Sequence, residues 1–167
     1  MTKFNYESKG YTVALMKPSI DTRNGINIIK SRIGLQDTAA IIRPTDNLYE
    51  WYVAKSNMPD VIIIDEAQFL TTNQVNQLKD IAIKYIPVLC FGLKTDFQTH
   101  LFEGSKRLIE IADSITEIKS ICKCGRKAEC NARISNGKVI KTGKQIQLGG
   151  NELYISMCYD CWKNNKL

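Results

Sequence analysis

The stretch Val61-Ile-Ile-Ile-Asp-Glu-Ala-Gln-Phe69 decides the fold, because it reads as a buried strand that ends in two adjacent carboxylates. Residues 61–64 are four consecutive apolar β-formers, with no polar position among them that would face water. Near-continuous apolar runs of this kind are typical of strands in a parallel sheet that is covered on both faces. The stretch therefore predicts a buried parallel strand over residues 61–64, with Asp65 and Glu66 at its carboxyl end.

Strand and helix signals alternate along the rest of the first 120 residues. Residues 2–9 read as the last turns of a helix that Gly10 ends. Apolar side chains recur at helical spacing over residues 71–85, at Val75, Leu78, Ile81 and Ala82. The other predicted elements are strands at 11–17, 39–43, 87–92 and 114–118, an acid-capped helix at 46–56 and a helix at 105–112. The alternation predicts an α/β fold built on a parallel sheet.

Composition limits the class of protein. The chain has 167 residues, 44% of them hydrophobic, which suffices for a packed core. It shows no apolar run long enough to span a bilayer and no apolar segment typical of a signal peptide, so the cytoplasm is the expected location and no membrane partner is expected. The formal charge of +6 suits polyanions but equally fits a protein with surplus surface lysine.

The last part of the chain differs from the rest. Five of the six cysteines fall in residues 121–167, among short β-branched stretches and the turns 135–137 and 149–150. We expect a boundary near residue 120, with an α/β domain at 1–120 and a small β-rich, metal-bound domain at 121–167.

Two cysteine pairs predict a structural zinc site. Cys122 and Cys124 are separated by one residue, and Cys158 and Cys161 by two. Four thiolates delivered two by two from separate turns satisfy tetrahedral zinc and leave no open position for catalysis. The alternative is four unliganded thiols. Cys90 lies in an apolar strand and is expected in the core, whereas Cys130 is expected to take no part in the site.

The carboxylates after residue 64 suggest chemistry on a nucleoside triphosphate. In such enzymes a strand of this kind ends in the carboxylate that holds Mg²⁺, a role we give to Asp65. A glutamate beside it can accept a proton from a hydroxyl, a role we give to Glu66. The alternative is a strand end that carries two solvated acids.

The phosphate-binding loop that usually accompanies this strand is absent from the 167 residues. No Gly-x-x-x-x-Gly-Lys-[Ser/Thr] motif occurs; Gly92-Leu-Lys-Thr95 has an extra residue between glycine and lysine. Because the chain opens on what reads as the end of a helix, we expect a shortened gene model or an internal start at Met1. In-frame codons for a Gly-Lys-[Ser/Thr] loop are then expected immediately upstream.

Separated motifs in one order resemble the zinc-containing, tetrameric type of thymidine kinase. They include Lys17-Pro-Ser-Ile-Asp-Thr-Arg23, Asp65-Glu-Ala-Gln-Phe69, Gly92-Leu-Lys-Thr-Asp-Phe-Gln98, Leu101-Phe-Glu-Gly-Ser105, Ile121-Cys-Lys-Cys-Gly125, and Leu148-Gly-Gly150 with Tyr154. The resemblance implies a nucleotide-kinase-like parallel sheet without its first strand and phosphate loop, followed by a zinc-bound lasso domain. It also implies a homotetramer.

The resemblance implies an activity and assigns residues to it. The activity is transfer of the γ-phosphoryl group of ATP, with Mg²⁺, to the 5′-hydroxyl of thymidine or deoxyuridine. Glu66 resembles the base and Asp65 the Mg²⁺ carboxylate. Gln68 belongs to the same nucleotide and metal neighbourhood, and Arg23 resembles a residue that faces the reacting phosphate.

The nucleoside-binding residues implied by the resemblance fall into two groups. The base and sugar walls are Phe69, Leu93, Phe97 and Phe102; core packing is the alternative for these phenylalanines. The lasso residues are Gln147, Leu148, Gly149 and Gly150, which read the pyrimidine edge through the main chain, with Tyr154 supporting the sugar.

Two other functions stay open. One is an inactive chain that serves at most as a zinc-stabilised nucleoside-binding subunit, since the phosphate loop is missing. The other, a zinc-ribbon nucleic-acid binder, is weaker because basic and aromatic residues are not interleaved in the tail, so no nucleic-acid partner is expected.

Overall fold

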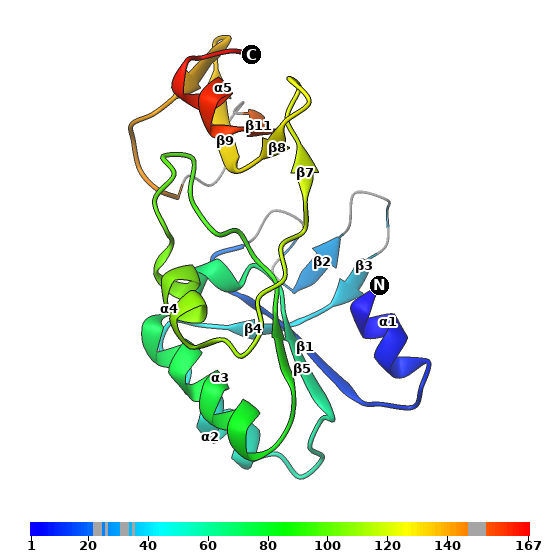
Figure 1. Ribbon diagram of the computed structural model, residues 1–167. Helices are drawn as coiled ribbons and strands as arrows, with labels where there is room; N and C mark the ends of the chain where they lie inside the picture. Colours follow the sequence, from blue (N-terminus) through cyan, green and yellow to red (C-terminus); the bar gives the residue numbers. More distant parts are fainter. Residues whose placement is uncertain (22–24, 26, 31–33, 35, 147–152) are drawn as a thin grey trace. The chain divides into compact units, whose positions relative to one another are not determined.

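The computed structural model describes residues 1–21, 25, 27–30, 34, 36–146 and 153–167. The chain divides into two compact units (Figure 1). Unit 1 comprises Met1–Leu93 and Glu103–Ala112, and unit 2 comprises Lys94–Phe102 and Asp113–Leu167.

A four-stranded parallel sheet forms the centre of unit 1 (Figure 1). Its order is β4 (Ala40–Ile42), β1 (Val13–Pro18), β5 (Val61–Ile64), β6 (Val88–Cys90). β5 pairs with both neighbours in parallel, with Leu15 and Leu89 each opposite Ile63. All four β5 side chains are buried. The predicted buried parallel strand at residues 61–64 and the α/β class are therefore confirmed.

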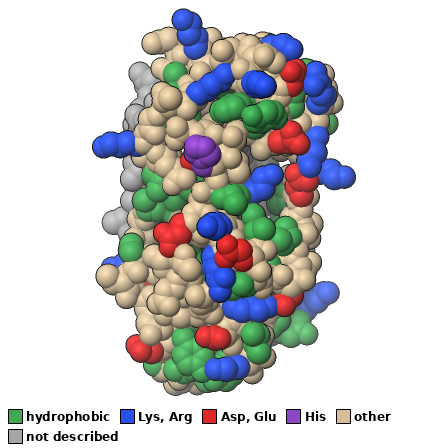
Figure 2. All heavy atoms as spheres, turned by 60° about the vertical axis from the view of Figure 1, so that its left-hand side comes forward, with side chains coloured by type: hydrophobic (Ala, Val, Ile, Leu, Met, Phe, Trp, Pro, Cys, Tyr) green, Lys and Arg blue, Asp and Glu red, His purple; other side chains and the backbone are tan. Residues whose placement is uncertain are grey.

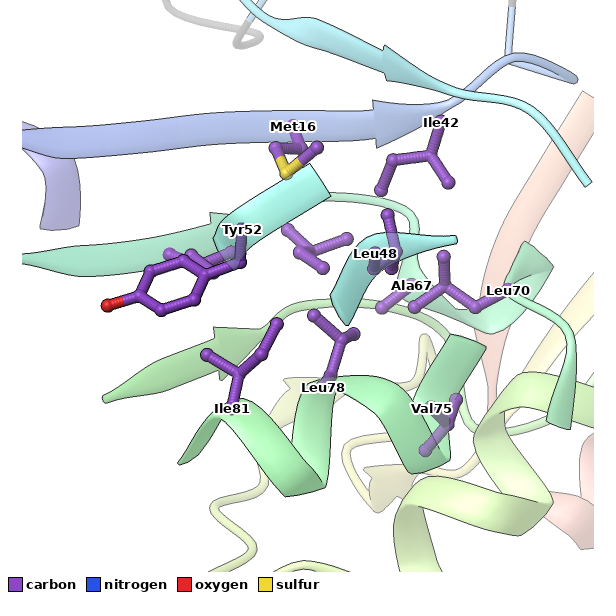
Figure 3. Packing of buried hydrophobic residues seen from close by; sticks show 11 residues of the cluster. Met16, Ile42, Leu48, Tyr52, Ala67, Leu70, Val75, Leu78 and Ile81 are labelled. Atoms are coloured by element: carbon purple, nitrogen blue, oxygen red, sulfur yellow. The ribbon is translucent and has the colours of Figure 1, made fainter. Parts of the chain in front are cut away.

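Helices bury their apolar stripes against this sheet. α3 (Thr72–Lys84) begins with a capping box in which Thr71 and Gln74 exchange hydrogen bonds, which satisfies two helix-end groups. Figure 3 shows Leu78 and Ile81 rising from the same face of α3, with Leu78 toward Leu48 and Ile81 toward the side of Tyr52 in α2 (Leu48–Val53). Burial of each such side chain contributes about 1.5–3 kcal/mol. Val75, Leu78 and Ile81 are buried as predicted, and Ala82 is half-buried.

The start of unit 1 is a short helix and a strand pair. α1 (Thr2–Glu7) matches the helix predicted over 2–9, and Gly10 follows it with a left-handed φ of 85°. The antiparallel pair β2 (Ile28–Lys30) and β3 (Gln36–Thr38) was absent from the sequence-based expectation. Lys3 of α1 forms an ion pair with Asp37 of β3.

Three sequence-based details are corrected. The strand predicted at 114–118 is wrong: these residues form no strand, and Ile115 and Ile118 are 63% and 80% exposed. The helix predicted from residue 46 starts at Leu48, because its N-cap is Asn47, whose side chain accepts from the amides of Tyr49 and Glu50. The last helix of unit 1, α4 (Glu103–Ile111), starts two residues before its predicted first residue.

Unit 2 is β-rich, as expected. Its three-stranded antiparallel sheet has β9 (Cys130–Ser135) between β10 (Lys138–Ile140) and β11 (Leu153–Met157). Asn136 and Gly137, both with positive φ, make the predicted turn between β9 and β10. The remaining elements are the strand pair β7 (Ser120–Ile121) and β8 (Lys127–Ala128) and the helix α5 (Tyr159–Lys163).

Two general features are the lengths of the helices and the distribution of surface charge. Within the part of the chain that is described, no helix is both long and apolar enough to cross a membrane. Basic and acidic side chains are interspersed on the face of the molecule shown in Figure 2. That face therefore carries basic side chains mixed with acidic ones and not a separate basic patch.

Candidate functional site

The two carboxylates lie where the chain leaves β5. The amide of Asp65 donates to the carbonyl oxygen of Met16 in β1 at 3.0 Å, and its Oδ1 accepts from the amide of Glu66 at 3.0 Å. Glu66 has a left-handed φ of 53°, which is uncommon for a residue with a side chain. It precedes the short 3-10 helix η1 (Ala67–Phe69). Both carboxylates are half-buried at the carboxyl end of a central strand.

Gln68 holds the Glu66 carboxylate in one orientation. Its Nε2 donates to Glu66 Oε2 at 2.6 Å, while its Oε1 accepts from the amide of Leu93 at 3.0 Å. The Leu93 amide can only donate, so it fixes which end of the Gln68 amide faces Glu66. Gln68 is buried. The resemblance assigns Gln68 to the nucleotide neighbourhood, and the folded chain adds its contact with Glu66.

Two glycines let other backbone segments approach η1. A Cβ on Gly92 would lie 2.4 Å from Gln68 Oε1. A Cβ on Gly104 of α4 would lie 2.7 Å from the carbonyl oxygens of both Ala67 and Leu70. Ser105 Oγ also donates to the Leu93 carbonyl oxygen at 2.6 Å. Close packing of α4 on η1 therefore supports the segment that carries Gln68.

Gly104→Ala is expected to lower the free energy of unfolding by about 1–3 kcal/mol, because the new methyl group overlaps backbone oxygens that cannot move independently. Urea denaturation monitored by circular dichroism would measure it. Lys106→Ala, at an exposed position of the same helix, is the matched control and should change stability by less than about 0.5 kcal/mol. Equal stability of Gly104→Ala and the parent chain would contradict the close approach.

Lys17 is a buried cation that sequence analysis did not single out. It lies near the carboxyl end of β1, and its Nζ is 3.3 Å from Asp21 Oδ2. The same Nζ donates to the carbonyl oxygens of Gly25 at 3.1 Å and Ile28 at 2.9 Å. A buried ammonium group needs such partners. Lys17 therefore links Asp21, Gly25 and Ile28 to β1.

The other predicted site residues divide between the units. Phe69 is half-buried in η1 and Leu93 is exposed after β6, so both share unit 1 with Asp65, Glu66 and Gln68. Phe97, Phe102 and Tyr154 belong to unit 2; the two phenylalanines are buried and Tyr154 is 39% exposed. The residues Arg23, Gln147, Leu148, Gly149 and Gly150 lie outside the described residues.

Arg133 of β9 brings two of these residues together. Its guanidinium carbon lies 3.7 Å from the centroid of the Phe97 ring, and its Nε donates to the Tyr154 hydroxyl at 2.8 Å. Sequence analysis missed Arg133. The only signal was one charged residue inside a short strand, which does not reveal a buried cation.

Four cysteine sulfurs converge in unit 2. The Sγ atoms of Cys122, Cys124, Cys158 and Cys161 all lie within 4.8 Å of one another. Cys122 and Cys124 come from the turn between β7 and β8, and Cys158 caps α5 and accepts from the amide of Cys161. This arrangement suits a metal ion, since thiolates from two turns surround one point.

The cysteine thiols differ in pKa because their surroundings differ. Amide groups of Cys124 and Cys158 lower the pKa of Cys122 to about 6. Burial, reinforced by neighbouring thiols, raises the pKa of Cys161 to about 12. Burial also raises the pKa of Cys90, which packs on the core of unit 1, to about 12. Cys130 is buried and lies outside the four-sulfur cluster, as expected.

Comparison with known proteins decides the family. The family model described as thymidine kinase matches residues 2–162. The chain belongs to the thymidine kinase family. One relative in this family is the thymidine kinase of Vibrio parahaemolyticus. It is 45% identical to this chain over 166 residues, which cover 97% of this chain and 86% of the relative.

Relatives from a phage and from another bacterium give the same result for the family. The thymidine kinase of Enterobacteria phage T4 is 43% identical over 162 residues, covering 95% of this chain and 83% of the relative. That of Streptococcus pyogenes is 44% identical over 156 residues, covering 92% and 82%. The resemblance drawn from the separated motifs to the thymidine kinase family is confirmed.

Proposed function

We propose that this protein is an enzyme that transfers the γ-phosphoryl group of ATP to the 5′-hydroxyl of thymidine or deoxyuridine, a step of pyrimidine deoxynucleoside salvage. The observation that carries the proposal is the Asp65–Glu66 pair at the end of β5, with Glu66 held by Gln68 at 2.6 Å. Family membership adds the substrate class. Phosphoryl transfer depends mostly on positioning and charge neutralisation, and a carboxylate fixed in one orientation meets the first need.

Glu66 is the group we assign as general base. Gln68 Nε2 occupies Oε2 of the carboxylate, which constrains how the side chain turns. An ionised carboxylate can take the proton of the 5′-hydroxyl as the oxygen attacks the phosphorus. Arg23, outside the described residues, is assigned to face the reacting phosphate.

Mg²⁺ is proposed as the metal that accompanies ATP. Hard oxygen donors suit this ion, and the half-buried carboxylate of Asp65 at the strand end supplies one. When bound, Mg²⁺ neutralises charge on the transferred phosphoryl group. The neighbouring Gln68 belongs to the same surroundings through its contact with Glu66.

Nucleoside-binding roles are proposed within each unit. In unit 1 they fall to Phe69 and Leu93, and in unit 2 to Phe97, Phe102 and Tyr154. The lasso segment Gln147, Leu148, Gly149 and Gly150 is assigned to the pyrimidine edge. We also propose a structural zinc ion at the four cysteines, a domain boundary near residue 120, a homotetramer and a cytoplasmic location.

The second candidate is a zinc-stabilised subunit that binds nucleoside without transferring phosphate. The observation behind it is the four-sulfur cluster, which could hold a metal ion in the same unit as Phe97 and Tyr154. Calorimetry with thymidine and with ATP separates the two candidates. Thymidine binding without ATP binding or product formation favours this second function.

The main proposal is tested by a kinase assay. Protein expressed from its own gene, with the upstream DNA retained, is incubated with ATP, Mg²⁺ and each of the four common deoxynucleosides, and with deoxyuridine. The proposal expects monophosphate from thymidine and deoxyuridine. Equal turnover of purine deoxynucleosides would contradict the assigned substrate class.

A further inference from the structure

Arg133 is a buried cation in the central strand of the sheet in unit 2. Its side chain is 1% exposed. A charge removed from water to this degree is retained only where hydrogen bonds and π-faces replace its hydration. The contacts of Arg133 therefore show what the residue is built to hold.

Those contacts join two aromatic residues that are far apart in sequence. The guanidinium lies over Phe97 at 3.7 Å and near the Tyr154 ring at 5.5 Å. Nε donates to the Tyr154 hydroxyl at 2.8 Å. Tyr154 lies directly opposite Arg133 in the pairing of β11 with β9, so both side chains leave the same face of the sheet.

Arg133 also reaches the segment that follows β10. Its two terminal nitrogens, Nη1 and Nη2, are each 3.4 Å from the carbonyl oxygen of Lys144. Gln145, the next residue, donates to the buried carboxylate of Asp96 at 2.9 Å. One side chain thus contacts three separate segments of unit 2.

The backbone around Phe97 is fixed without Arg133. Trp162 Nε1 donates to the Phe97 carbonyl oxygen at 2.9 Å. Asp96 Oδ1 accepts from the amides of Gln98 at 2.8 Å and His100 at 3.0 Å. Phe97 is therefore held in place by contacts other than those of Arg133. The residue whose orientation depends on Arg133 is the partly exposed Tyr154.

We propose that Arg133 is a positioning residue for nucleoside binding, which acts by fixing the Tyr154 ring against the buried Phe97. The inference rests on the proposed function, since it takes Tyr154 as part of the nucleoside site. Lysine cannot replace Arg133, because an ammonium group is neither planar nor able to stack on one ring while donating sideways to a second residue. The effect falls on the nucleoside, not on ATP.

The test compares zinc-loaded Arg133→Lys and Arg133→Gln with the parent chain. Thymidine Kd is measured by calorimetry, and KM and kcat are measured in protein expressed with its upstream DNA. Both variants should raise Kd and thymidine KM by about tenfold, while kcat and the KM for ATP change less than twofold. Arg126→Lys, an exposed arginine of unit 2, is the matched control and should leave Kd unchanged.

A double-mutant cycle with Tyr154→Phe identifies the route of the effect. Tyr154→Phe removes the hydroxyl that Arg133 binds. In this background, substitution of Arg133 should weaken thymidine binding less than it does in the parent chain. Zinc content and the fluorescence of Trp162, measured in a Trp51→Phe background, report whether unit 2 keeps its fold.

The outcomes are distinguishable. No thymidine binding by the parent chain would refute the proposed function itself. Thymidine binding by the parent, with Kd changed less than twofold in the folded Arg133 variants or with fully additive losses in the cycle, overturns the role of Arg133 alone. Loss of zinc and of folded Trp162 fluorescence in both Arg133 variants also overturns it, by assigning Arg133 to stability.

Discussion

Glu66→Gln is expected to lower kcat for thymidine phosphorylation by about 10²–10⁴-fold, the range typical of a lost general base. The neutral amide of glutamine has the shape of the carboxylate. Its oxygen can still accept the hydrogen bond that Gln68 Nε2 donates to Glu66 Oε2 at 2.6 Å in the parent chain. Glutamine has the same branching at Cβ as glutamate, so the left-handed backbone at position 66 should be kept. A fall in kcat would therefore report the loss of proton acceptance and not a change in the geometry of the site.

The measurement is steady-state kinetics with thymidine, ATP and Mg²⁺, alongside zinc analysis. Glu110→Gln provides the control, since this exposed glutamate of α4 pairs with Arg107 at the surface of unit 1. Its kcat should stay within twofold of the parent. Full turnover by Glu66→Gln, with zinc content unchanged, would remove Glu66 from the role of base.

Removal of the zinc ion proposed at the four cysteines is expected to unfold unit 2. Structural zinc contributes on the order of 10 kcal/mol to the folding of small zinc-bound modules. In unit 2 the buried cysteines Cys122, Cys158 and Cys161 belong to the same core cluster as Ala132 and Met157. Without the metal, the sulfurs would take up protons, and the bonds that join the two cysteine turns inside this core would be lost. Because protons compete with zinc for the sulfurs, the metal should be released as pH falls.

Chelator titration followed by near-UV circular dichroism measures this effect, with Cys158→Ser as the genetic counterpart. Cys130→Ser is the matched control, because Cys130 is also buried in unit 2 but lies outside the sulfur cluster. The control should bind one zinc ion per chain. A Cys158→Ser chain with full zinc content and an unchanged spectrum would show that the four sulfurs do not form the site.

The parts of the fold that sequence predicted are those with one dominant signal. The β5 run has no polar residue, so its burial on both faces followed directly from residue type. The helix at 72–84 carried an apolar stripe at helical spacing. By contrast, Ile115 and Ile118 resemble strand residues in sequence but are exposed, and no local signal distinguishes an exposed isoleucine from a buried one.

The site was predictable only where its residues are adjacent in sequence. Asp65, Glu66 and Gln68 lie within four positions, so one motif was enough to propose them. The contact that orients Gln68 comes from the amide of Leu93, 25 residues away, and exists only in the folded chain. Buried Lys17 and Arg133 were missed for the same reason, because a charged side chain in sequence gives no sign of its burial.

The measurement that tests the central claim most directly is thymidine-dependent transfer of phosphate from ATP labelled at the γ position. Protein expressed from its own gene, in the presence of Mg²⁺, should convert thymidine to thymidine 5′-monophosphate, with one ADP formed for each labelled product and with Glu66→Gln nearly inactive. Release of ADP without labelled thymidine monophosphate, or equal labelling by Glu66→Gln, would contradict the account.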